Sequence, residues 1–181
     1  MSEPTVLESG AASGMSGWAY DAPLTWAQVC EDPTLDGLPY RIELDRYGRL
    51  LMSPVSTRHS RLQGRVARLL EDSLGGEAFP ECAIKTSEGI RSPDVVWMSE
   101  AFATSIEDGA IALSRAPEIC VEVQSPSNPW AEMEEKVTLY LAKGAHEVWI
   151  CEPDGRMRFF GHEGERETSE LMEDAPSRVT L

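Results

Sequence analysis

Residues 118–123 have the sequence EICVEV, and the predicted fold is built around them. Its odd-numbered positions are apolar, and they alternate strictly with Glu118, Cys120 and Glu122. This period of two predicts a β-strand whose two faces differ in polarity. The elements predicted before and after this strand complete the expected fold.

A helix is predicted after this strand, because Ser127 or Asn128 can cap it and Gly144 lies just past Lys143, its expected last residue. Residues 146–151, HEVWIC, then predict a second strand. A strand, a helix and another strand in this order indicate a helix that crosses over between two strands. The expected fold class is therefore mixed α/β.

The clearest helix upstream covers residues 56–74, with Ser56 or Thr57 as cap and two glycines at its end. At about 100° per residue, one of its faces is apolar. Residues 82–86 and 94–98 predict short strands, and residues 99–117 a loop. The apolar face of the helix consists of Leu62, Val66, Leu69 and Leu70.

Two hairpins flank this core. Residues 40–53 contain two strand-like runs around a turn at positions 46–48, and a Pro-Asp-Gly turn joins residues 146–151 to residues 156–161. A short helix capped by Thr25 precedes the first hairpin.

The N-terminal segment is rich in Gly, Ser, Ala and Glu and lacks periodicity, which predicts a disordered tail over residues 1–17. The chain has 181 residues, a length that suits one domain over residues 18–181.

The chain is strongly acidic, with 16 Lys and Arg against 31 Asp and Glu and a net charge of −15. This balance excludes a generally basic nucleic-acid coating protein and argues against an anionic membrane as partner. The sequence shows no apolar run long enough to span a membrane and no secretory signal. Four scattered cysteines without a CxxC motif argue against a disulfide framework or a zinc site, so a cytoplasmic location is expected.

Asp94 and Glu122 lie in strand segments that are otherwise apolar. A buried carboxylate needs a partner, so neighbouring strands could bring both acids to one divalent cation. Mg²⁺ or Mn²⁺ fits oxygen ligands better than zinc does. The alternatives are that Asp94 caps the start of its strand and that Glu122 lies on the polar side of a half-exposed strand.

Several motifs around these acids resemble the Uma-type family of restriction endonucleases, which belongs to the PD-(D/E)XK nuclease-like superfamily. The resemblance covers roughly residues 40–160, and the motifs occur in the same order as in the family. They are GRLLMSP (48–54) followed by His59 and Gln63, SPDVVWM (92–98), APEICVEVQSPSN (116–128) and EKVTLYLAKGAHEVWI (135–150).

This resemblance implies a restriction endonuclease-like αβββαβ core, with the two hairpins as N- and C-terminal additions, and metal-dependent cleavage of phosphodiester bonds. By position, Asp94 corresponds to the Asp of the PD half and Glu122 to the acid of the (D/E)XK half. The backbone carbonyl of Val123 corresponds to a third metal ligand.

The sequence departs from the superfamily pattern at Gln124, where a catalytic lysine is expected. Glutamine can hydrogen-bond a water or a phosphate but carries no positive charge. In the family a lysine on the following helix substitutes, and the matching residue is Lys136. Alternatively, Lys136 pairs with Glu132, four residues earlier on the helix.

Further site candidates come from the first hairpin and the first long helix. Glu43 is an additional carboxylate and Glu81 a weaker one, although both could be solvated acids. Gln63 and His59 lie roughly 40° apart on the apolar side of the helix. The resemblance places that helix beside the metal site, so Gln63 could contact substrate, whereas His59 suits a structural role.

Arginines recur along another face of the same helix, where they could contact phosphate or form a solvated face. Arg61 and Arg65 are the candidate substrate contacts; the full stripe is Arg58, Arg61, Arg65 and Arg68.

The sequence therefore predicts a Mg²⁺-dependent endonuclease that acts on DNA and forms a homodimer. One alternative is a nuclease fold that no longer cuts and serves as a binding or assembly module, which Gln124 and the net charge favour. Another is a hydrolase of a small phosphorylated molecule, which would tolerate an acidic surface better.

Overall fold

The computed structural model describes residues 22–126 and 128–181. The predicted N-terminal tail and Ser127, one of the two expected helix caps, lie outside the described residues. Among the helices of the described ranges, none combines the length and the apolar composition that a membrane span requires.

A six-stranded sheet forms the centre of the molecule, in the order β10-β9-β8-β7-β6-β3. Strands β7 and β8 are parallel, and α4 (Trp130–Ala142) connects them, which confirms the predicted crossover. The other neighbouring pairs are antiparallel. The strands are β3 (Glu77–Phe79), β6 (Val95–Met98), β7 (Ile119–Val123), β8 (Glu147–Cys151), β9 (Met157–Gly161) and β10 (Gly164–Arg166).

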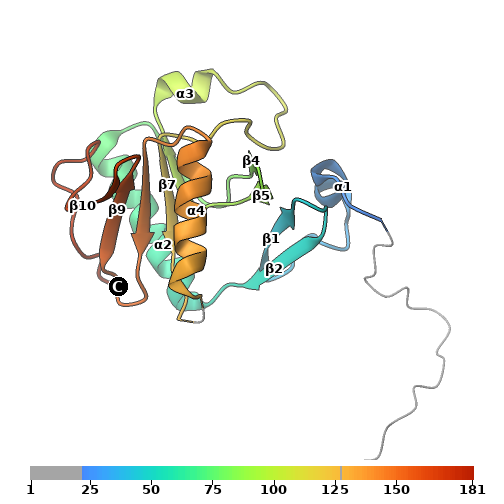
Figure 1. The fold of residues 1–181 in the computed structure, drawn as a ribbon, viewed down its shortest axis with the longest axis horizontal. Helices are drawn as coiled ribbons and strands as arrows, with labels where there is room; N and C mark the ends of the chain where they lie inside the picture. Colours follow the sequence, from blue (N-terminus) through green and yellow to red (C-terminus); the bar gives the residue numbers. More distant parts are fainter. Residues whose placement is uncertain (1–21, 127) are drawn as a thin grey trace, which may run out of the picture.

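Helices α2 (Thr57–Leu74) and α4 lie on opposite faces of this sheet (Figure 1). The Ser56 hydroxyl caps α2 by accepting the His59 amide at 3.2 Å. Leu62, Val66 and Leu70 of the predicted apolar face are buried against the sheet. The sheet is thus covered on both sides, and every residue of β6, β7 and β8 is buried.

A smaller sheet lies to one side of the first, in the order β2-β1-β5-β4 (Figure 1). It contains the predicted first hairpin. Helix α1 (Trp26–Glu31) begins directly after its predicted cap, Thr25, and packs against this sheet. Gly89 begins a strand at φ 108°, and the Leu44 carbonyl oxygen lies 2.2 Å from where a Cβ would be. The strands are β1 (Tyr40–Asp45), β2 (Leu50–Pro54), β4 (Ile84–Thr86) and β5 (Gly89–Arg91).

Strand β7 has no exposed face, because α4 covers the side that carries Glu122, so the alternative of a half-exposed strand is wrong. Two local expectations were also wrong. The expected loop after β6 contains a short helix, α3 (Glu100–Thr104), capped by Ser99. Helix α4 begins after Pro129 without a side-chain cap, since the Asn128 carboxamide oxygen instead accepts from Ser125.

Candidate active site

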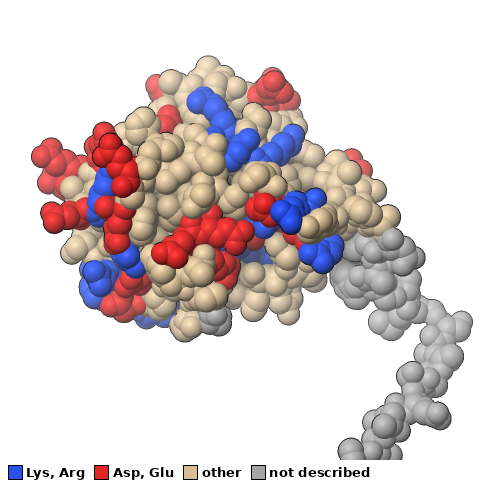
Figure 2. All heavy atoms as spheres, viewed as in Figure 1, with Lys and Arg blue, Asp and Glu red and all other residues tan. Residues whose placement is uncertain are grey.

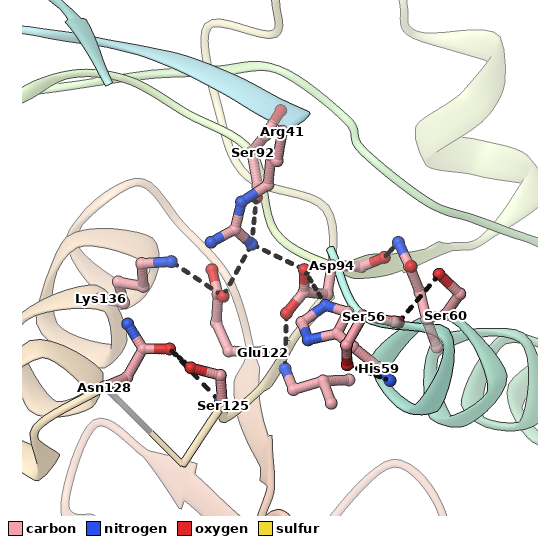
Figure 3. Close-up of polar contacts among 12 residues, drawn as sticks. Arg41, Ser56, His59, Ser60, Ser92, Asp94, Glu122, Ser125, Asn128 and Lys136 are labelled. Atoms are coloured by element: carbon pink, nitrogen blue, oxygen red, sulfur yellow. Dashed lines mark hydrogen bonds and ion pairs between the residues drawn. The ribbon is translucent and has the colours of Figure 1, made fainter. Parts of the chain in front are cut away.

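Asp94 and Glu122 converge in the main sheet where β6 begins and β7 ends. Asp94 immediately precedes β6, Glu122 lies near the end of β7, and the two strands are antiparallel neighbours. Arg41 of β1 reaches both acids: its Nη1 lies 2.6 Å from Asp94 Oδ1 and 3.3 Å from Glu122 Oε2 (Figure 3). Asp94 is 2% exposed and Glu122 1%, so the pair is almost fully desolvated.

Helix α2 and strand β7 hold Asp94 in place. His59 Nε2 lies 2.9 Å from Asp94 Oδ1, and the Val123 amide donates to Oδ2 at 2.6 Å. Gln63, on the same side of α2, donates from Nε2 to the Asp94 backbone carbonyl at 2.6 Å. Both carboxylate oxygens of Asp94 and its carbonyl oxygen are therefore hydrogen-bonded.

Helix α4 supplies the partners of Glu122. Lys136 Nζ donates to Oε2 at 2.9 Å, and the Tyr140 hydroxyl donates to Oε1 at 2.7 Å. Lys136 and Tyr140 are four residues apart, so they lie one above the other on the helix face that covers the sheet. Lys136 thus contacts Glu122, whereas Glu132 accepts from the Asn128 carboxamide.

The protein environment moves the pKa values of the two acids in opposite directions. Burial favours the neutral form of Asp94, but the His59 hydrogen bond and the Arg41 charge outweigh it and lower the pKa. For Glu122, burial outweighs the attraction of Lys136 and Arg41, and the pKa is raised. Burial likewise lowers the pKa of Arg41, but Glu122 and Asp94 outweigh it, so its pKa rises and it stays charged.

A cavity of about 120 Å³ opens beside this cluster. Strands β1 and β2, the start of α2 and the loop after β7 surround it, so both sheets contribute to one pocket. Its lining includes Arg41, His59, Asp94, Glu122 and Asn128. Through this pocket a small polar group can reach Asp94 and Glu122, which are otherwise buried.

Three further residues that the sequence suggested for the site, Glu43, Gln124 and Glu81, do not line this cavity. Glu43 is buried in β1 and accepts the Ser92 amide at 2.7 Å, so it holds the segment that leads into Asp94. Gln124 donates from Nε2 to the Asn128 carbonyl at 3.2 Å and does not contact the two acids. Glu81 is exposed.

Arg61 and Arg65 are exposed on the side of α2 that faces away from His59 and Gln63. They do not line the cavity. The structure therefore separates the arginine stripe from the carboxylates, and any contact that these residues make with a substrate lies outside the pocket.

Sequence reasoning missed Arg41 and Tyr140. Tyr140 could have been found, because it follows Lys136 by four residues and a residue at that spacing shares its helix face. Arg41 could not, because it belongs to the other sheet and nothing local in β1 sets it apart from exposed arginines of the same hairpin. Its role depends on how the two sheets pack.

The donor set at the cavity fits a hard divalent cation. The Asp94 and Glu122 oxygens lie within 3.3 Å of one Arg41 nitrogen, so a single ion could touch both. Two carboxylates, a carbonyl such as that of Val123, and water are ligands that Mg²⁺ accepts. Within the described residues, no group of three or more His, Cys, Asp and Glu side chains is arranged to hold a metal.

Comparisons with known proteins agree with the fold. A crystal structure of a putative nuclease belonging to DUF820 from Anabaena variabilis is similar, with a TM-score of 0.67 over 87% of this chain and 95% of that chain, at 15% identity. No curated protein sequence matches this chain. The family model of Uma2, described as putative restriction endonuclease, matches residues 27–178. That range includes both sheets and all the cavity residues, and the chain belongs to the Uma2 family.

Proposed function

We propose that this protein is a divalent-metal-dependent nuclease that hydrolyses phosphodiester bonds in DNA. The observation that carries the proposal is the convergence of two desolvated carboxylates, Asp94 and Glu122, beside an open cavity with Lys136 hydrogen-bonded to one of them. The family description and the similar nuclease fold support the same reaction class.

Each side chain of the cluster has a role in this proposal. Asp94 and Glu122 bind Mg²⁺ or Mn²⁺, which when bound supplies an activated water and offsets charge on the phosphate. Lys136 holds Glu122 in position and places positive charge near the developing negative charge. His59 and the Val123 amide orient Asp94, so that its oxygens keep one geometry.

The surface charge suggests where DNA would approach. In Figure 2, acidic side chains gather over β9 and β10 and across the middle of the visible face, whereas basic side chains gather toward the smaller sheet. Arg46, Arg49 and Lys85 are exposed on that sheet. We propose that the phosphate backbone of DNA approaches from this side. We further propose that the protein acts in the cytoplasm as a homodimer, in which each of the two sites cuts one DNA strand.

Nicking of supercoiled plasmid DNA by the purified protein tests the function. We expect cleavage in Mg²⁺ or Mn²⁺ and none in EDTA, with loss of cleavage in Asp94→Asn and Glu122→Gln. Lys136→Met is expected to reduce the rate by about 10²–10³-fold. Asp72→Asn is the matched control, since it removes an exposed aspartate charge near the end of α2, whereas His59 lies near the start of that helix, and Asp72 does not line the cavity.

Activity that survives in both Asp94→Asn and Glu122→Gln would contradict the proposal. The second candidate, a nuclease fold that binds without cutting, is favoured by one contact: Arg41 already bonds to the oxygens that a metal would need. It predicts DNA or protein binding by the wild type with no nicking under any metal.

A further inference from the structure

Arg41 occupies the position of a cation at the site. Its Nη1 bonds to one oxygen of each acid and lies 3.4 Å from the Ser92 carbonyl oxygen. In Figure 3 the guanidinium lies between Asp94 and Glu122. Without a positive group there, two carboxylates this close and this buried would repel each other strongly.

The other two guanidinium nitrogens of Arg41, Nε and Nη2, make fewer hydrogen bonds within the described part of the chain than Nη1 does. No hydrogen bond from Nε or Nη2 to a described residue accompanies the three from Nη1. Arg41 also lines the cavity of about 120 Å³, so there is room beside the acids into which its head can turn. It reaches the acids from β1 of the smaller sheet, whereas Lys136 comes from a helix packed tightly on the main sheet.

We propose that Arg41 is an exchangeable internal counter-ion, which keeps Asp94 and Glu122 converged in the metal-free protein and must leave them before a divalent cation binds. This inference rests on the proposed function and adds a regulatory step to the same site. Lys136 remains on Glu122 in both states. Metal affinity is then limited by the fraction of molecules in which Arg41 has turned away.

The consequence is that removing the Arg41 guanidinium should strengthen metal binding. If Arg41 is turned away in one molecule in ten, the apparent dissociation constant for metal is about tenfold larger than the intrinsic one. Arg41→Met should therefore bind Mn²⁺ about tenfold more tightly than the wild type. Arg41→Lys keeps one charge but loses the guanidinium, and should fall between the two.

Calorimetric titration of Mn²⁺ into the full-length proteins measures this directly, with melting temperature as a second readout. In EDTA, Arg41→Met should melt below the wild type, and saturating Mn²⁺ should raise its melting temperature by more than it raises that of the wild type. Arg49→Met is the matched control, because it removes the same charge from the same hairpin, and Arg49 contacts Asp45 and the Tyr47 ring but neither Asp94 nor Glu122. It should bind Mn²⁺ as the wild type does.

Equal or weaker Mn²⁺ binding by both Arg41 variants would overturn the inference, and so would an absence of binding in all proteins. The plasmid assay separates this result from a failure of the proposed function. Metal-dependent nicking by the wild type with unchanged affinity in the variants refutes the counter-ion and leaves the nuclease. Absence of both binding and nicking refutes both.

Discussion

Two buried glutamates in adjacent parallel strands show how differently one residue type can be used. Glu122 in β7 and Glu147 in β8 are each 1% exposed, and each lies in a run of otherwise apolar residues. Glu122 is surrounded by charged groups, with Lys136 and Arg41 as ion-pair partners. It also lines a cavity.

Glu147 is held by neutral donors. Trp149 Nε1 and the Ser169 hydroxyl each donate to Oε2 at 2.7 Å, and the backbone amides of Glu170 and Leu171 donate to Oε1. Its oxygens thereby tie the segment after β10 to the main sheet. No cation is needed, because four donors replace the water that a carboxylate loses on burial.

The difference separates a structural acid from a candidate catalytic one. Both are satisfied, and among the described residues no buried side-chain polar atom lacks a partner. Glu147 has neutral partners that stabilise the fold and leave it nothing to exchange. Glu122 has cationic partners and access to a cavity, which are the features on which its proposed role as a metal ligand rests. Four experiments test this difference between the two glutamates and their partners.

The largest effect is expected from Lys136→Met. Lys136 is 4% exposed, and its removal leaves Glu122 with less compensation for its burial. We expect a loss of about 3 kcal/mol in the free energy of unfolding, measured by urea denaturation at pH 7. Glu122→Gln combined with Lys136→Met should recover most of the loss, since it removes the stranded charge. A double variant as unstable as the single one would contradict this.

Glu147→Ala should cost about 2 kcal/mol in the same measurement, because four donors lose their acceptor while the desolvation cost of the buried carboxylate also disappears. Mn²⁺ affinity per folded molecule should not change, since Glu147 does not line the cavity. Glu163→Ala, an exposed acid in the β9–β10 turn, is the control and should be nearly neutral. A change in Mn²⁺ affinity for Glu147→Ala would contradict the assignment of a purely structural role to Glu147.

Asp94→Asn should make stability less sensitive to acid. Because the folded pKa of Asp94 is lowered, its ionised form stabilises the protein above the unfolded pKa of about 3.9, and that stability is lost as the pH falls through the folded value. We expect the wild type to exceed the variant by about 1.5 kcal/mol at pH 7, with the gap narrowing below about pH 4. A gap that is constant with pH would refute the assignment.

The smallest effect is expected from Tyr140→Phe, which removes one hydrogen bond to Glu122 and leaves the ring packed. It should cost about 1 kcal/mol of unfolding free energy. Tyr47→Phe, which removes an exposed hydroxyl beside Arg46, is the control and should cost less than about 0.5 kcal/mol. Equal losses in the two variants would mean that the Glu122 contact adds nothing to stability.

Much of the fold was predictable because local patterns and global packing agree. The apolar face of α2, the Thr25 and Ser56 caps and the Asp154–Gly155 turn each specify an element by short-range chemistry. Strands β3 and β10 were missed, since three residues of strand carry too little periodicity to stand out.

The sequence alone was enough to predict that Glu122 lies in an apolar strand, that Asp94 stands at the start of another, and that a helix connects β7 and β8; the resemblance to a known family singled out Glu122. Only the tertiary structure showed how the surroundings of Glu122 and Glu147 differ, because most of their partners come from distant segments. It also brought Arg41 from the second sheet between the two acids. The physical reason is that the interactions of a buried charge depend on every group packed around it, whereas a sequence pattern records only its neighbours along the chain.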